Sequence, residues 1–247
     1  MGGYAGLHAR WYDLVYGDKP YAEEAAFVNR LCGEPGGRLL DLACGTGRHA
    51  KAFDDLGYDV TGVDLNAELI EHARSRVPVG RFLVDDMRTV ALDERFDVVT
   101  CLFDAIGYPL TNEGVSASLA SVARHLADEG RFAIEFLHAP AMVRHARPVG
   151  VRRVALPDGG TLVRIAETTL DEQAHTMTVR YEMLALGADG RFSRSEETQA
   201  NRFFDVEEMR ELLGAAGLDV AKLVAAYSTD ERIDDRTFHV VAVGGLR

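Results

Sequence analysis

Two glycines, Gly45 and Gly47, and an aspartate that follows them have the types and spacing of a cofactor site. The glycines lie between an apolar stretch, 39–42, and a run of good helix formers, 50–53. Glycine permits a tight turn and lets a ligand approach the backbone. The first turn of a helix offers unpaired N–H groups and a positive dipole end to a carboxylate or a phosphate. Asp64 follows about 20 residues on, which also fits the dinucleotide fingerprint. By itself the pattern also allows a strand–helix turn that binds no ligand.

Five apolar stretches must position these residues, and helical stretches such as 67–76 and 113–126 separate them. The five expected strands are 39–42, 59–65, 81–84, 96–103 and 131–137. Near-continuous apolar strands that alternate with helices predict a parallel sheet covered on both faces. Ligands bind such a sheet at the carboxyl ends of its strands. Those ends hold residues 44–47, Asp64, Asp86, 103–104 and His138.

The pattern changes after residue 151. Residues 161–169 and 175–186 alternate with a period of two, and turn residues at 158–160 and 189–190 separate these runs. In the second run the alternation places four side chains on one face: Met177, Val179, Tyr181 and Met183. Such alternation predicts antiparallel strands, and a further strand is expected over 192–204. The α/β pattern then resumes with a helix over 206–216 and strands over 218–227 and 237–244.

Composition and charge exclude several function classes. The chain has 247 residues and a net charge of −12, whereas a nucleic-acid-binding surface is expected to be basic. No apolar run approaches the roughly 20 residues that span a bilayer, and residues 1–10 lack the apolar core of a signal peptide. The three cysteines and the histidines, among them His8 and His239, show no metal-ligand spacing. We therefore expect a cytoplasmic protein that binds no metal, no nucleic acid and no membrane.

Four motifs in this order resemble the class I S-adenosylmethionine-dependent methyltransferases. They are the turn at 41–47, the strand end Gly62-Val63-Asp64-Leu65, Asp86-Met87-Arg88, and Phe96-Asp97-Val98-Val99. The resemblance covers 39–137 and resumes from 205 to the end. It implies an α/β fold: a doubly wound, Rossmann-like, seven-stranded, mostly parallel sheet whose last strand is antiparallel, plus an inserted antiparallel β-sheet. Residues 1–138 and 205–247 would form the S-adenosylmethionine-binding domain, and 139–204 a subdomain that serves as substrate lid or oligomer interface.

The opening segment, 12–16, and the inserted sheet resemble one subgroup more closely. These are small-molecule N-methyltransferases of natural-product (antibiotic) pathways, notably those acting on nucleotide-linked amino sugars. The chain departs from that subgroup at two places. Asp85 stands where a glycine is usual, and His138-Ala139-Pro140 replaces an aromatic-rich segment.

The resemblance implies S-adenosylmethionine as cofactor and S-adenosylhomocysteine as product. The backbone at Gly45 and Gly47 would contact the methionine part, whose carboxylate suits a helix N-terminus. Asp64 would accept hydrogen bonds from both ribose hydroxyls; the alternative is an ordinary turn aspartate. The full set of expected cofactor-binding residues is Tyr16, Asp41, Ala43, Gly45, Gly47, Asp64, Leu65, Asp86, Met87 and Phe103.

Adenine binding would fall to four members of that set. Leu65, Met87 and Phe103 would enclose the ring by apolar contact, and Asp86 would accept from its exocyclic amine. The alternative for Leu65 and Phe103 is that they belong to the ordinary core.

Two residues at strand ends are the candidates for catalysis. We expect Asp104 to orient an acceptor amine and His138 to accept a proton, directly or through water, since an amine must be neutral to attack. The alternatives are that Asp104 caps the following segment and that His138 is a loop histidine. The candidate substrate-binding residues are Tyr12, Tyr108, Arg202 and Arg236. The two arginines suit an anionic group such as a phosphate, or they belong to a solvated surface.

The sequence therefore predicts a methyltransferase that acts on a small-molecule amine, an amino sugar or a similar natural-product intermediate. An O-methyltransferase is the near alternative, because one fold serves several acceptors. An NAD(P)-dependent oxidoreductase and a cofactor-binding protein without catalysis are more remote ones. The inserted sheet would select the substrate or join two copies in a homo-oligomer.

Overall fold

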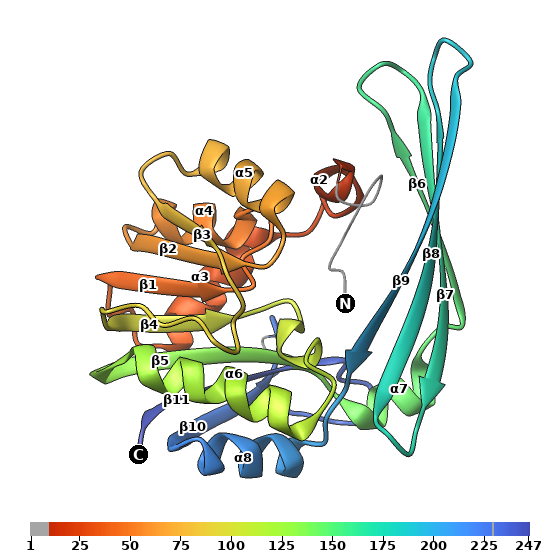
Figure 1. Cartoon of the computed structure of the whole chain (residues 1–247). Helices are drawn as coiled ribbons and strands as arrows, with labels where there is room; N and C mark the ends of the chain where they lie inside the picture. Colours follow the sequence, from red (N-terminus) through yellow and green to blue (C-terminus); the bar gives the residue numbers. More distant parts are fainter. Residues whose placement is uncertain (1–9, 229) are drawn as a thin grey trace.

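Two β-sheets form the frame of the molecule in this computed structural model (Figure 1). Residues 10–228 and 230–247 are described. His8 and most of the stretch 1–10, about which the sequence made predictions, lie outside the described residues. In the described part of the chain, no helix is both long and apolar enough to cross a membrane.

The larger sheet has seven strands in the order β10-β11-β5-β4-β1-β2-β3. Its five parallel strands are β1 (Arg38–Leu42), β2 (Asp59–Asp64), β3 (Arg81–Val84), β4 (Phe96–Cys101) and β5 (Leu126–Leu137). The last strand, β11 (His239–Leu246), runs antiparallel to both β5 and β10 (Leu218–Ala225). The predicted fold class is therefore confirmed, including the antiparallel last strand.

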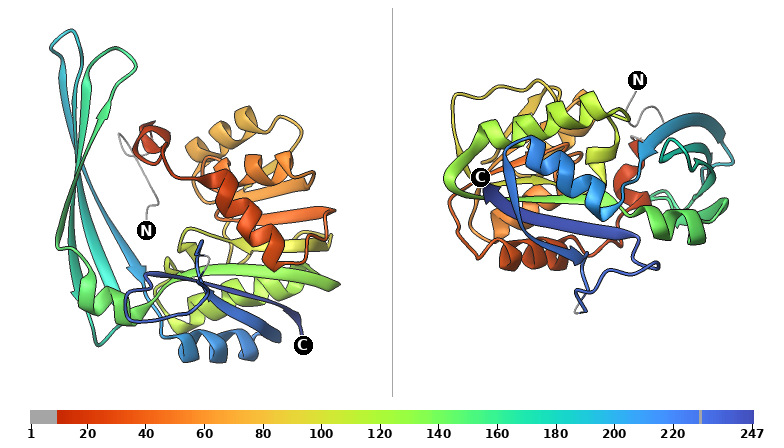
Figure 2. Two further views of the ribbon diagram at one scale, coloured as in Figure 1. Left: turned by 180° about the vertical axis from the view of Figure 1, so that it is seen from behind. Right: turned by 90° about the horizontal axis from the view of Figure 1, so that it is seen from below.

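Helices cover both faces of the larger sheet, which explains why its strands are apolar throughout. One face packs against α3 (Tyr21–Leu31), α4 (Arg48–Asp55) and α5 (Ala67–Arg76), through buried residues such as Val28, Phe53 and Ile70. The other face packs against α6 (Asn112–His125) and α8 (Val206–Ala215), with Leu119 and Leu213 in that core. The two layers of helices are visible from below in Figure 2.

The smaller sheet is antiparallel and lies within the inserted stretch. Its order is β6 (Val149–Ala155), β7 (Thr161–Asp171), β8 (Thr176–Leu186) and β9 (Phe192–Arg202). The sequence did not predict β6, where charged and glycine residues interrupt the alternation, nor the short helix α7 (Ala139–His145), which carries a proline in its first turn.

The two faces of the smaller sheet differ as the alternation predicts. Met177, Val179 and Tyr181 face the larger sheet across a cavity. Arg180 and Arg194 form ion pairs with glutamates of neighbouring strands, such as Glu167 and Glu182.

A short helix, α2 (Tyr12–Val15), lies between the two sheets (Figures 1 and 2). Its Val15 is fully buried among side chains of the smaller sheet, including Leu162 and Met183. Its Asp13 accepts hydrogen bonds from Thr46 and Arg48, next to the glycine turn of the larger sheet. α2 therefore connects the predicted cofactor turn to the inserted sheet.

Candidate active site

The glycine turn between β1 and α4 has the conformation that its sequence requires. Gly45 and Gly47 both have positive φ, +55° and +73°, a region that L-residues with a Cβ rarely adopt. A Cβ on Gly47 would lie 2.9 Å from the Cβ of Ala73, so this glycine also lets α5 pack closely. A Cβ on Gly45 would meet no described atom within 4 Å, so the backbone at Gly45 borders open space.

Asp64 ends β2 beside this turn. Its two carboxylate oxygens each accept one backbone N–H, from Gly45 at 2.9 Å and from Asn66 at 2.8 Å. Burial raises the pKa of Asp64, and the two N–H groups oppose that rise. Because a carboxylate has about four lone-pair sites, Asp64 retains acceptor capacity for two further donors.

A small pocket opens against the turn. It contains four of the expected cofactor residues, Asp41, Ala43, Gly45 and Phe103, together with Arg48 and the aromatic ring of Tyr21. Thr100 donates a hydrogen bond of 2.8 Å to Asp41, while burial raises the pKa of that carboxyl to about 6. The pocket thus offers groups of both charge signs, which suits the zwitterionic end of an amino acid.

The three apolar residues expected at the adenine differ in their burial. Leu65 is 59% exposed and therefore is not a core residue, whereas Met87 is buried in the core of the sheet. Phe103 packs with Tyr12 and Leu69. An exposed leucine beside a half-buried aspartate is a suitable platform for an apolar ring that the ligand brings.

The carboxylate of Asp86 already has a partner, Arg88. The guanidinium and the backbone N–H of Arg88 both donate to its carboxylate, and these hydrogen bonds hold the pKa of Asp86 below its usual range.

A larger cavity of about 330 Å³ lies between the carboxyl ends of the larger sheet and the inner face of the smaller one. Phe103 lines both this cavity and the small pocket, so the two spaces are neighbours. Asp104 and Tyr108 contribute to the wall on the side of the larger sheet. From the smaller sheet and the segment before it come Arg147, Arg164, Met177, Val179, Tyr181 and Asn201.

The backbone that carries Asp104 is strained. Phe103 and Asp104 follow β4 with φ of +56° and +58°, and each non-glycine residue in this region costs about 1–3 kcal/mol. The N–H of Phe103 donates to Glu135 at 2.8 Å, and the carbonyl of Asp104 accepts from the side chain of Asn201 at 3.2 Å and from the N–H of Gly107 at 3.1 Å. These contacts hold the carboxylate of Asp104 against the cavity.

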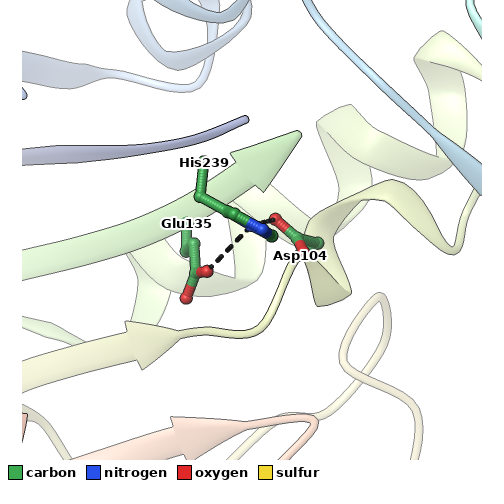
Figure 3. A group of neighbouring side chains, drawn as sticks. All are labelled: Asp104, Glu135 and His239. Carbon is green, nitrogen blue, oxygen red and sulfur yellow. Dashed lines mark hydrogen bonds and ion pairs between the residues drawn. The ribbon is translucent and has the colours of Figure 1, made fainter. Parts of the chain in front are cut away.

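Three titratable side chains from separate elements meet at this point: Asp104, Glu135 and His239 (Figure 3). Nδ1 of His239 lies 3.0 Å from Oδ1 of Asp104 and 3.3 Å from Oε1 of Glu135. The negative charge of Asp104 outweighs burial and raises the pKa of His239 to about 11, so its ring is an imidazolium at neutral pH. Burial raises the pKa of Asp104, and the positive charge of His239 limits that rise.

Comparison with known proteins identifies the family. Residues 39–130 match the family model described as a methyltransferase domain. A dTDP-3-amino-3,6-dideoxy-alpha-D-glucopyranose N,N-dimethyltransferase of Streptomyces fradiae is 32% identical over 88% of this chain and 86% of its own length. The chain belongs to the S-adenosylmethionine-dependent methyltransferases.

Solved structures agree with this assignment. DesVI of Streptomyces venezuelae superposes with a TM-score of 0.84 at 27% identity, covering 99% of this chain and all of that one. CalS10, an amino pentose methyltransferase from Micromonospora echinaspora with S-adenosylmethionine bound, gives a TM-score of 0.77 at 28% identity over 98% of both chains. The predicted family and cofactor are thus confirmed.

The residues around the glycine turn fit this cofactor. The small pocket would hold the methionine part, Asp64 the ribose hydroxyls, and Leu65 one face of the adenine. Phe103 would lie where the cofactor site meets the larger cavity, so a methyl acceptor in that cavity would face Asp104.

Tyr12 and Tyr16, which the sequence analysis assigned to substrate and cofactor, line different spaces in the structure. Tyr12, expected at the substrate, lines the small pocket, and Tyr16, expected at the cofactor, lines the larger cavity. The Tyr16 hydroxyl accepts a hydrogen bond of 2.8 Å from Arg164. The two tyrosines are four residues apart on one helical face, so the sequence could not tell which of them reaches which space.

The arginines at the larger cavity are not the predicted ones. Arg202 is buried, where it pairs with Glu208 and stacks on the ring of Phe204. Arg236 is exposed, and its backbone N–H donates to Asp234. The cavity wall instead holds Arg147 and Arg164. The alternation over 161–169 was the available signal for Arg164, because it places this arginine on the same strand face as Leu162 and Ala166.

His138 does not contact Asp104 in the structure. Its ring lies 3.0 Å from the carbonyl of Thr237, it is buried, and it is not part of the described cavity walls. The histidine beside Asp104 is His239, which the sequence analysis set aside with the scattered histidines. The expected antiparallel last strand was the available signal, because its first residue must lie at the carboxyl end of β5.

Proposed function

We propose that this methyltransferase methylates the amine of a nucleotide-linked amino sugar. The observation that carries the proposal is the carboxylate of Asp104, held against the larger cavity next to Phe103, which also lines the cofactor pocket. The named activity of the Streptomyces fradiae relative supports the same acceptor class.

An amine acceptor enters at neutral pH as an ammonium ion and must lose a proton before it can attack. Asp104 accepts a hydrogen bond from the ammonium group, orients it, and takes the proton; a positioned base of this kind typically contributes about 10²–10⁴-fold to the rate. Bound S-adenosylmethionine would supply a methyl carbon that its sulfonium activates. This carbon would bond to the nitrogen as the carbon–sulfur bond breaks, and the electron pair of the broken bond would stay on sulfur. Orientation of the acceptor by the chain supplies much of the remaining acceleration.

The charge at the cavity favours a cationic acceptor group. Two carboxyl groups, Asp104 and Glu135, flank one imidazolium, His239, so acidic groups outnumber basic ones in the cluster next to the cavity. Arg147 and Arg164 lie elsewhere on the cavity wall, and guanidinium groups suit phosphate oxygens. A cavity wall with a carboxyl group and two guanidinium groups suits a molecule that carries both an amine and a diphosphate.

The remaining roles follow from this assignment. Residues 1–138 with 205–247 bind the cofactor, and the inserted segment 139–204 selects the acceptor. A homo-oligomer through the inserted sheet and a cytoplasmic location complete the proposal. The buried, unpaired state of Cys32, Cys44 and Cys101 supports that location.

The test is methylation of dTDP-3-amino-3,6-dideoxy-alpha-D-glucopyranose, with the corresponding 3-hydroxy sugar nucleotide as the matched control. Mass spectrometry should detect one or two added methyl groups on the amine and none on the hydroxy compound. Calorimetry should detect binding of S-adenosylhomocysteine and not of NAD or NADP. Methylation of the hydroxy compound alone would establish the O-methyltransferase alternative and refute the proposal.

A further inference from the structure

His239 lines neither the small pocket nor the larger cavity, yet its side chain contacts Asp104. It is the first residue of β11 and pairs in register with Leu137 at the end of β5. Its carbonyl accepts from the N–H of Ala226, which fixes the backbone. Its Nδ1 therefore lies between two buried carboxylates that come from β5 and from the loop after β4.

We propose that His239 is a positioning residue for methyl transfer: its Nδ1–H bridges Asp104 and Glu135 and keeps the Asp104 carboxylate ionised and directed at the acceptor amine. The inference rests on the proposed function, because it assigns the reason for which Asp104 is competent. His239 does not itself line the acceptor cavity, so it acts through Asp104.

The bridge ties together both residues of the strained loop. Glu135 accepts the N–H of Phe103 at 2.8 Å and the hydroxyl of Tyr227 at 2.6 Å through its Oε2, while its Oε1 faces His239. Glu135 thus holds the backbone of Phe103, and His239 holds the side chain of Asp104. Loss of His239 would leave two buried carboxylates facing each other with no proton between them.

The two carboxyl groups next to the His239 ring favour its protonated form, and the nearby cation is paired with a carboxylate of its own. Asp104 and Glu135 contact Nδ1 of His239, and the hydroxyl of Tyr227 donates a hydrogen bond to Glu135. Lys19 is the nearby cation: its Nζ lies 4.9 Å from the centre of the Phe103 ring, and it is paired with Glu24. An imidazolium in this setting can donate a hydrogen bond but cannot accept a proton, which leaves Asp104 as the group that receives the proton of the acceptor.

Two substitutions separate the bridge from its charge. His239→Asn keeps an N–H donor close to the position of Nδ1 without a positive charge, and His239→Ala removes both. His175→Asn is the matched control, because His175 faces Glu208 at 3.5 Å outside the described cavity walls. The measurements are kcat/KM for the sugar nucleotide between pH 6 and pH 10, affinity for S-adenosylhomocysteine, and the thermal midpoint.

His239→Ala should lower kcat/KM at neutral pH about tenfold or more and move its acid limb to higher pH, because the pKa of Asp104 rises when the imidazolium is lost. His239→Asn should recover activity at high pH, where Asp104 is ionised without help. Affinity for S-adenosylhomocysteine should stay unchanged in both variants and in the control. An acid limb that stays in place, or a loss of activity matched by the loss of cofactor affinity and thermal stability, would refute the positioning role.

A second measurement does not depend on the acceptor. Nitrogen-15 NMR of the histidine rings in the S-adenosylhomocysteine complex identifies the His239 signal as the one that is missing in His239→Asn. This signal should be that of an imidazolium up to pH 9, and Asp104→Asn should lower the pH at which the ring titrates. Titration near its ordinary value would refute the bridge even if no amine were methylated. Loss of activity with EDTA that zinc or magnesium restores would also refute it, because a divalent cation would then take the place of the proton.

Discussion

Among single residues, Asp64 is expected to contribute most to cofactor affinity. Its carboxylate already fixes the N–H groups of Gly45 and Asn66, and both ribose hydroxyls would donate to it. Hydrogen bonds to a charged group contribute about 1.5–3 kcal/mol each, so the loss of two should weaken S-adenosylhomocysteine binding in Asp64→Ala by at least about a hundredfold. Isothermal titration measures this, with Asp59→Ala, at the exposed start of the same strand, as the control. Equal affinity in both variants would contradict the ribose role.

The sequence predicts the cofactor turn in full but only part of the group around Asp104. The glycine turn and Asp64 were predictable because the motif is local and each strand end fixes its own residue. The group around Asp104 was only half predictable. His239 lies 135 residues further along the chain, and its partner is decided by the pairing of β11 with β5, whereas the neighbour in sequence, His138, turns to the carbonyl of Thr237.

At the scale of elements, α2 is too short to be stable alone, because isolated helices shorter than about 12 residues are marginal in water. It is held from two sides. Asp13 accepts from Thr46 at 2.7 Å and from Arg48 at 3.0 Å and pairs with Arg76, while Val15 is buried against the smaller sheet. These contacts, rather than any pattern in the segment itself, determine its position.

Asp13→Ala should therefore loosen α2 and weaken cofactor binding. Three basic or hydroxyl partners at the glycine turn would lose their acceptor, and Tyr12 would be less firmly held in the small pocket. We expect a fall in S-adenosylhomocysteine affinity of about tenfold, corresponding to one charged hydrogen bond. Hydrogen exchange should rise over residues 10–20. Asp18→Ala, which breaks an exposed pair with Arg152, is the control; equal exchange in both variants would count against this account.

At the scale of the whole molecule, the two sheets contribute differently to stability. The larger sheet is buried between two layers of helices. The smaller sheet has a row of exposed ion pairs on one face, including Arg180 with Glu167, and such surface pairs contribute only about 0–1 kcal/mol each. The predicted alternation gave the division into faces, but only the tertiary structure shows that the inner face of the smaller sheet lines the larger cavity.

The cluster of Asp104, Glu135 and His239 at the carboxyl ends of β4 and β5 should make stability depend on pH through His239 and Glu135. The pKa of His239 is raised from 6.5 to about 11, chiefly by the charge of Asp104, so its contribution is complete below pH 6.5 and is lost progressively as the pH rises towards 11. Although burial opposes it, the hydrogen bond from His239 lowers the pKa of Glu135 from 4.5 to about 2, so that contribution is present above pH 4.5 and is lost as the pH falls towards 2.

Urea unfolding between pH 7 and pH 9 isolates the first of these effects, because Glu135 stays ionised throughout that range. The free energy of unfolding of the wild-type protein should fall with rising pH more steeply than that of the double variant His239→Asn/Asp104→Asn, since the double variant has neither an imidazolium nor a buried carboxyl that could lose a proton in this range. His175→Asn, which removes a histidine remote from Asp104, should retain the wild-type slope. If the curves of the wild-type protein and the double variant ran parallel, the proton on His239 would not stabilise the fold, which would count against the bridge between the two carboxylates.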